Sequence, residues 1–146
     1  MTAKIQFHPP RQDAERRVSD AWGAGHFGAS RGDRTHKGID FLIPADSTVY
    51  SAATGTVSKI GRPYADSPFR YVEVKDVNGN RIRHFYVNPT VRAQDRVFLG
   101  APIGLSQDLS TRYPGDKSRG PMPNHMHLEI KTATGDYLDP DDYLFT

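Results

Sequence analysis

The stretch that decides the fold is HMHLEIK, residues 125–131, because polar and apolar side chains alternate along it without a break. Successive side chains of a strand point to opposite faces of the sheet. We therefore expect one set to face a core (Met126, Leu128, Ile130) and the other to share the opposite face (His125, His127, Glu129). On a strand the two histidines lie ~6.6 Å apart at the backbone, close enough to serve one site. An exposed polar face that holds two histidines by chance is the alternative.

Short β-branched and aromatic runs occupy much of the remaining chain and are separated by glycine and proline. Asn78-Gly79, between the runs at 69–76 and 81–87, is the strongest short hairpin signal. A Pro/Gly-rich loop of unusual length fills residues 106–124. The other runs are 41–43, 48–53, 55–60, 96–100 and 102–106. Together with 125–131 they predict a small, mostly antiparallel all-β domain.

Length and composition limit the classes of protein to consider. A chain of 146 residues is most simply one domain, here 21–146, preceded by a polar N-terminal segment, 1–20, whose residues 13–17 suggest one or two helical turns. The chain has no cysteine, which excludes disulfides and thiolate metal sites. Its formal charge of +2 does not point to nucleic acid, and no segment is apolar enough to span a membrane. The N-terminus also lacks the apolar core of a secretory signal.

His36 and Asp40 lie four residues apart in the run THKGIDF. Gly38 between them and the β-like residues that follow argue against a helix. On a straight strand the two would stand ~13 Å apart, so joint ligation of one ion requires the chain to bend, and Gly38 permits the bend. A surface histidine and a turn aspartate are the alternative interpretation.

His84 is expected on the same strand face as Ile82 and Tyr86. A lone strand histidine is more often structural than catalytic. The three histidine-bearing segments taken together favour a catalytic site. Two imidazoles and one carboxylate would leave the fourth position of a zinc ion for water, and two further histidines would remain to transfer protons and stabilise developing charge.

The order His36-x-x-x-Asp40, then His84, then His125-x-His127 resembles the lysostaphin/LytM-type zinc metallopeptidases, which cut peptidoglycan peptides. The resemblance runs from about residue 20 to the C-terminus. Residues 36–57 are similar to the family's ligand turn and the strand pair after it, and RIRHFYVNP at 81–89 loosely matches its Tyr-x-His-Leu segment. Ile82 and Phe85 stand where the family often has tyrosine and leucine.

The resemblance implies a β-sandwich with long loops around a substrate groove, and 21–146 as a single catalytic domain. His36, Asp40 and His127 would hold one Zn²⁺, and His84 and His125 would be the catalytic pair. Which of the two is the base stays open, and the strand geometry would also let His125 ligate. The partner expected is a peptidoglycan peptide, cut at a glycine bridge or a D-alanyl–diaminopimelate link by a monomeric enzyme. The enzyme would act at the cell wall, and a phage-encoded lysin is one source of such a domain.

Two other classes of protein share parts of this pattern. The run 36–40 also resembles the phosphohistidine stretch of glucose-type IIA phosphocarrier domains, which leaves His125 and His127 unexplained. A LytM-like domain that activates another cell-wall hydrolase without cutting peptides is the second. Such domains usually lack a ligand, whereas this chain retains them all.

Overall fold

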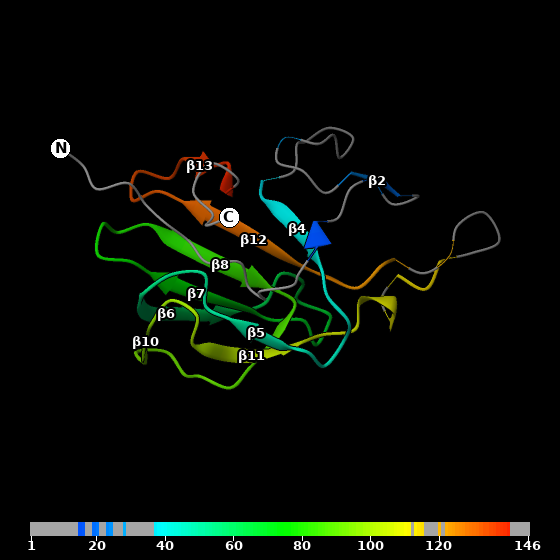
Figure 1. The fold of residues 1–146 in the computed structure, drawn as a ribbon, viewed down its shortest axis with the longest axis horizontal. Helices are drawn as coiled ribbons and strands as arrows, with labels where there is room; N and C mark the ends of the chain where they lie inside the picture. The colour runs from blue at the N-terminus through cyan, green and yellow to red at the C-terminus, as the bar shows by residue number, and fades with distance from the viewer. Residues whose placement is uncertain are drawn as a thin grey trace.

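The regular secondary structure of the described residues is almost entirely β-strand (Figure 1). The computed structural model describes residues 15–16, 19–20, 23–24, 28, 37–111, 113–115, 120 and 122–140. In chain order the strands are β1 (Glu15–Arg16), β2 (Ser19–Asp20), β3 (Gly23–Ala24), β4 (Ile39–Leu42), β5 (Thr48–Tyr50), β6 (Gly55–Gly61), β7 (Tyr71–Lys75), β8 (Arg81–Phe85), β9 (Val87–Pro89), β10 (Arg96–Val97), β11 (Pro102–Ser106), β12 (His125–Lys131) and β13 (Tyr137–Leu138). One 3₁₀ helix, Leu109–Thr111, precedes β12.

The larger sheet has the strand order β1-β4-β12-β8-β7-β6-β10, with β13 paired to β12. Every pairing between these strands is antiparallel. The long strand β12 lies between β4 and β8, as Figure 1 shows in orange, cyan and green. The stretch 125–131 therefore joins the segment that holds Asp40 to the segment that holds His84.

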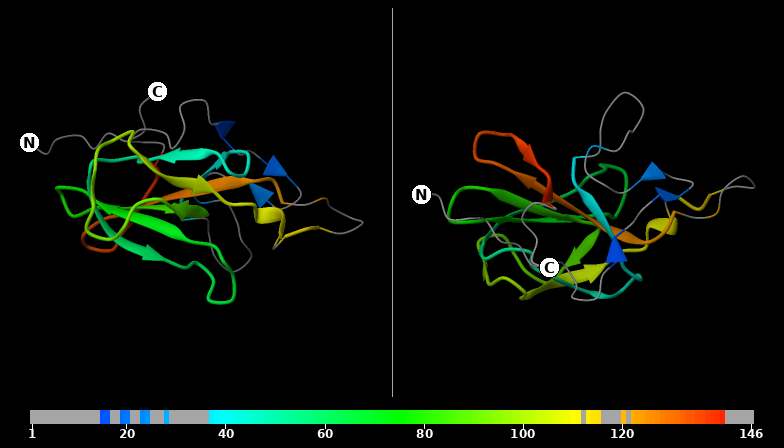
Figure 2. Two further views of the ribbon diagram at one scale, coloured as in Figure 1. Left: turned by 90° about the horizontal axis from the view of Figure 1, so that it is seen from below. Right: turned by 45° about the horizontal axis from the view of Figure 1, so that its top comes forward.

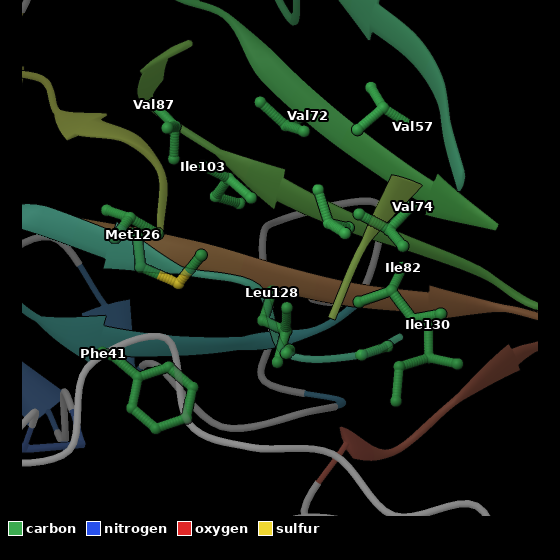
Figure 3. Close-up of a cluster of buried hydrophobic side chains, with 14 of the residues drawn as sticks. Phe41, Val57, Val72, Val74, Ile82, Val87, Ile103, Met126, Leu128 and Ile130 are labelled. Atoms are coloured by element: carbon green, nitrogen blue, oxygen red, sulfur yellow. The ribbon is translucent and has the colours of Figure 1, made fainter. Parts of the chain in front are cut away.

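A second sheet, in the order β5-β11-β9, lies along one side of the larger sheet (Figure 2). Apolar side chains from both sheets form one buried cluster (Figure 3). Val49 and Ile103 enter it from the smaller sheet, and Val72, Ile82 and Leu128 from the larger one. This is the two-layer arrangement of a sandwich, so the predicted all-β antiparallel fold is confirmed.

The hairpin predicted at Asn78-Gly79 joins β7 to β8. Gly79 has a φ of 81°, which a residue without a Cβ adopts at little cost. The Asp76 carboxylate accepts the backbone N–H groups of Asn78 and Asn80 at 2.9 Å each. These contacts fix the register of β7 and β8, and with it the faces on which the β8 side chains lie.

The helical turns suggested for 13–17 are wrong where the chain is described. Glu15 and Arg16 form β1 and pair with Leu42 and Phe41 at the edge of β4. Backbone pairing with an open sheet edge prevails over a local helix preference that is weak in so short a segment. In the part of the chain that the structure describes, no helix is long and apolar enough to cross a membrane.

Candidate active site on strands β4 and β12

Strands β4 and β12 bring Asp40 and His127 face to face. The two residues are register partners, and partners across an antiparallel pair project from the same face. His127 Nδ1 lies 2.8 Å from Asp40 Oδ1, and the Asp40 side chain is almost fully buried. Their neighbours Ile39, Phe41 and Leu128 point into the core instead. The alternation of 125–131 thus separates a core face from a polar face, as predicted.

His125 reaches the same carboxylate from the start of β12. Its Nε2 lies 3.7 Å from Asp40 Oδ2, and its Nδ1 lies 2.8 Å from the carbonyl oxygen of Pro123. A carbonyl can only accept a hydrogen bond, so the Nδ1 atom of His125 carries the proton. In the neutral ring the lone pair is then on Nε2, on the side of Asp40.

Glu129 holds the second nitrogen of His127. Its Oε1 lies 2.9 Å from His127 Nε2 and accepts that N–H, so the imidazole is oriented between two carboxylates. Burial acts to lower the pKa of His127, but the hydrogen bonds with Asp40 and Glu129 outweigh it and raise the pKa to about 9. Glu129 was placed on this face by the sequence but was not singled out for a role. Its position two residues after His127 was the available signal.

Asp40 and His127 fit a zinc site by the chemistry of their donors. Carboxylate oxygen and imidazole nitrogen are both zinc ligands, and Nδ1 and Oδ1 already face each other. A second carboxylate on the far nitrogen is the usual outer partner of a ligating histidine. Glu129 supplies it.

The bend predicted between His36 and Asp40 is present at Gly38. A Cβ at Gly38 would lie 2.0 Å from the backbone oxygen of Leu128 and 3.0 Å from His127 Cε1. Only glycine lets the chain pass this close to β12. His36 itself lies outside the described residues, and among those described no three side chains are arranged so that they could hold a metal ion without it.

The structure does not bring His84 to this group. His84 is the register partner of Val72 and Leu128 and is completely buried on the core face with Ile82. Its Nε2 accepts the N–H of Ala52 at 3.0 Å, and its Nδ1 lies 3.0 Å from the carbonyl oxygen of Val72. Burial lowers its pKa to about 4. Both nitrogens are held by the backbone, so this geometry gives no support to the catalytic role predicted for His84.

Tyr86 lies beside His125 instead. The two rings meet edge to face, with centroids 5.5 Å apart and planes at 85°. Tyr86 has a φ of 68°, which for a bulky residue is strained by roughly 1–3 kcal/mol. This turn breaks the alternation that was expected to place Tyr86 with Ile82 and His84. The sequence did not predict Tyr86 as a residue of this site, because no local sequence pattern indicates a positive φ at a tyrosine.

Two further aromatic side chains, Tyr64 and Phe69, pack against Tyr86. Its hydroxyl lies 3.2 Å from that of Tyr64, and its ring packs edge-on against Phe69 at 5.4 Å. Burial is the first cause that raises the pKa of Tyr86 far above its ordinary value, and the neighbouring Tyr64 is the next. The phenol is therefore protonated at all physiological pH values and remains able to donate a hydrogen bond.

Two curated relatives resemble the chain over most of its length. Leukocyte cell-derived chemotaxin-2 of Bos taurus is 30% identical over 131 residues, and that of Mus musculus 29%. The matched part covers 89% of this chain and 80% of each relative.

Several solved structures share the fold. Csd3 of Helicobacter pylori has a TM-score of 0.69 at 20% identity, with 98% of this chain and 34% of that one covered. A catalytic-domain variant of the prophage-encoded M23 protein EnpA from Enterococcus faecalis has a TM-score of 0.65 at 17% identity, with 94% and 95% covered. Lysostaphin has a TM-score of 0.63 at 19% identity, with 88% and 49% covered. This chain therefore spans about half of lysostaphin and a third of Csd3.

The sequence model described as "Peptidase family M23" matches residues 34–140, which include the bend at Gly38, the pair Asp40 and His127, and the end of β13. These residues make up most of the chain. The sandwich and its relatives agree with that match, as does the resemblance to lysostaphin-type peptidases seen in the sequence. The chain belongs to peptidase family M23.

Proposed function

We propose that this domain is a zinc-dependent endopeptidase that hydrolyses peptide bonds in peptidoglycan cross-links or stem peptides. The observation that supports it is the buried Asp40 carboxylate with His127 at 2.8 Å and His125 at 3.7 Å on one face of the sheet. Lysostaphin is described as an antimicrobial peptidase, and another protein with this fold as a zinc-containing peptidase from Vibrio cholerae. The M23 match supports this function over that of a phosphocarrier.

Asp40 and His127, with His36 as the third predicted ligand, would hold the ion. When bound there, zinc lowers the pKa of a water molecule and polarises the scissile carbonyl. Glu129 keeps His127 in one orientation by accepting a hydrogen bond from its Nε2–H. The outer carboxylate also makes the imidazole a stronger ligand.

His125 would act as the general base. Its Nδ1 proton is committed to Pro123, so Nε2 is the atom that takes a proton from the attacking water. The water oxygen forms a bond to the carbonyl carbon, and the carbonyl electron pair moves to its oxygen. When that pair returns, the C–N bond breaks, and His125 passes its proton to the leaving amine nitrogen. His84 is unsuited to this step because its Nε2 lone pair accepts a buried backbone N–H.

The substrate proposed for the domain determines where it would act. Peptidoglycan peptides are found at the cell wall, so we propose the wall as the site of action. A phage-encoded lysin remains one proposal for the source.

Digestion of purified peptidoglycan tests this function. Glycine-bridged and directly cross-linked walls are treated with the zinc-loaded protein, and the products are weighed by mass spectrometry. His125→Gln is expected to retain zinc and lose activity by about 10²–10⁴-fold, the usual contribution of a general base. His127→Gln is expected to lose both zinc and activity. Full lytic activity in His127→Gln would refute the proposal.

One observation favours a second function, that of a domain that holds zinc and binds wall peptides without cutting them. His84, which was predicted to complete the catalytic pair, faces the core. One zinc per chain together with peptide binding and no cleavage product from either wall would establish this alternative.

A further inference from the structure

The position of Tyr86 is imposed by the backbone around it rather than by local preference. Its N–H donates to the carbonyl of Arg70 at 2.8 Å, and its own carbonyl accepts the N–H of Gln107 at 2.9 Å. Two segments remote in the sequence therefore hold Tyr86 at its positive φ. Strained residues that the surrounding structure over-determines in this way cluster at active sites.

This turn exchanges the face on which the side chain lies. His84 lies with Leu128 on the core side, and Phe85 lies with His127, whose ring it meets at 5.1 Å. Strict alternation would return Tyr86 to the core side. Instead its ring lies edge to face with that of His125, whose Nε2 is 3.7 Å from the Asp40 carboxylate. The strain at Tyr86 brings a phenol to the side where peptide chemistry is proposed.

The chemistry of a phenol suits one need of that reaction. As water adds to the carbonyl carbon, negative charge develops on the carbonyl oxygen, and a preorganised donor stabilises it. The hydroxyl of Tyr64, 3.2 Å away, can donate to Tyr86 and leave the Tyr86 proton for the substrate. The Tyr86 hydroxyl can thus donate a hydrogen bond to the substrate while it accepts one from Tyr64.

We infer that Tyr86 is the substrate-facing partner of His125 and that its hydroxyl donates the hydrogen bond that stabilises the oxyanion. The inference rests on the proposed peptidase function and reassigns the second catalytic position from His84 to Tyr86. It also shifts the match to the family's Tyr-x-His-Leu segment by two residues, from 82–85 to 84–87. His84 then stands at the tyrosine of Tyr-x-His-Leu, Tyr86 at its histidine and Val87 at its leucine.

Tyr86→Phe tests the inference because it removes one oxygen and keeps the ring. Tyr50→Phe on β5 is the matched control, being the same chemical change outside the site. With the peptidoglycan fragment that the wild type cleaves, Tyr86→Phe is expected to lower kcat by about 10²–10³-fold, the cost of losing one oxyanion donor. KM and zinc content should change little. Tyr50→Phe should match the wild type.

A second measurement does not depend on turnover. A phosphinic peptide, in which a tetrahedral phosphinate replaces the cleaved bond, imitates the transition state and is titrated by calorimetry. Its Kd should rise about tenfold or more in Tyr86→Phe, because an analogue loses the interactions that the transition state loses. Wild-type kcat and Kd in Tyr86→Phe would overturn the inference while leaving the peptidase function intact. If the wild type cleaves no wall peptide, the proposed function fails, and an unchanged Kd would then refute the contact of Tyr86 as well.

Discussion

Acidification should destabilise this protein through His84. The imidazole is completely buried, its Nε2 accepts the N–H of Ala52, and its Nδ1–H donates to the carbonyl oxygen of Val72. Burial lowers its pKa from an ordinary 6.5 to about 4 in the folded chain. Between these two pH values the unfolded chain binds a proton that the folded chain does not. Stability is therefore complete above about pH 6.5 and falls as the pH decreases toward 4.

The size of the loss follows from the difference between the two pKa values. With pKa values of about 4 folded and 6.5 unfolded, the total loss is roughly 3 kcal/mol, since a tenfold change in proton affinity is about 1.4 kcal/mol. About 2 kcal/mol of it should be lost between pH 7 and pH 5. Glu73 contributes little in this range because its pKa lies below the ordinary 4.5 in the fold. His127 opposes the loss, because its pKa of about 9 lets the folded chain hold a proton that the unfolded chain gains only as the pH falls from 7 to 5. A comparison with a variant that lacks only the His84 imidazole therefore isolates the contribution of His84.

Urea denaturation followed by circular dichroism at pH 7 and pH 5 measures the loss. His84→Gln is the control, since its amide can accept from Ala52 and donate to Val72 but does not titrate in this range. We expect the variant to be less stable than the wild type at pH 7, and we expect the wild type to lose about 2 kcal/mol more than the variant between pH 7 and pH 5. An equal loss in wild type and variant would show that His84 is not the titrating group and that its buried geometry is wrong.

Two further predictions concern the supports of the sheet. Arg83→Ala should destabilise the fold by about 2–3 kcal/mol in the same urea assay, because it leaves the buried Glu73 carboxylate without its 2.6 Å partner. Arg81→Ala, which removes a more exposed cation 4.0 Å from Glu73, should cost less than 1 kcal/mol, and equal costs would contradict the assignment. Gly38→Ala should weaken zinc binding, because its Cβ would meet the backbone of Leu128 at 2.0 Å and push β4 away from His127. Competition with a chelating dye measures the zinc affinity. Gly100→Ala is the control for a loss of stability alone, because its Cβ would meet nothing within 4 Å but its φ, unlike that of Gly38, is positive.

Much of the fold could be predicted because its signals are local. Period-two alternation in 125–131 assigned His125 and His127 to one face and Leu128 to the core, and the structure confirms both faces. Asn78-Gly79 set the hairpin through the backbone freedom of glycine. Gly38 was predicted to bend the chain for a similar reason. Each of these depends on a residue and its immediate neighbours.

The sequence by itself therefore determined an antiparallel β domain and one polar face that carries His125 and His127. Only the tertiary structure decided which side chains meet there. The register of β4 against β12 brings Asp40 to His127, and the register of β8 sends His84 into the core. Tyr86 lies beside His125 because backbone hydrogen bonds with Arg70 and Gln107 hold it at a positive φ. Those partners are distant in sequence, and their hydrogen bonds override the alternation that a strand alone would impose.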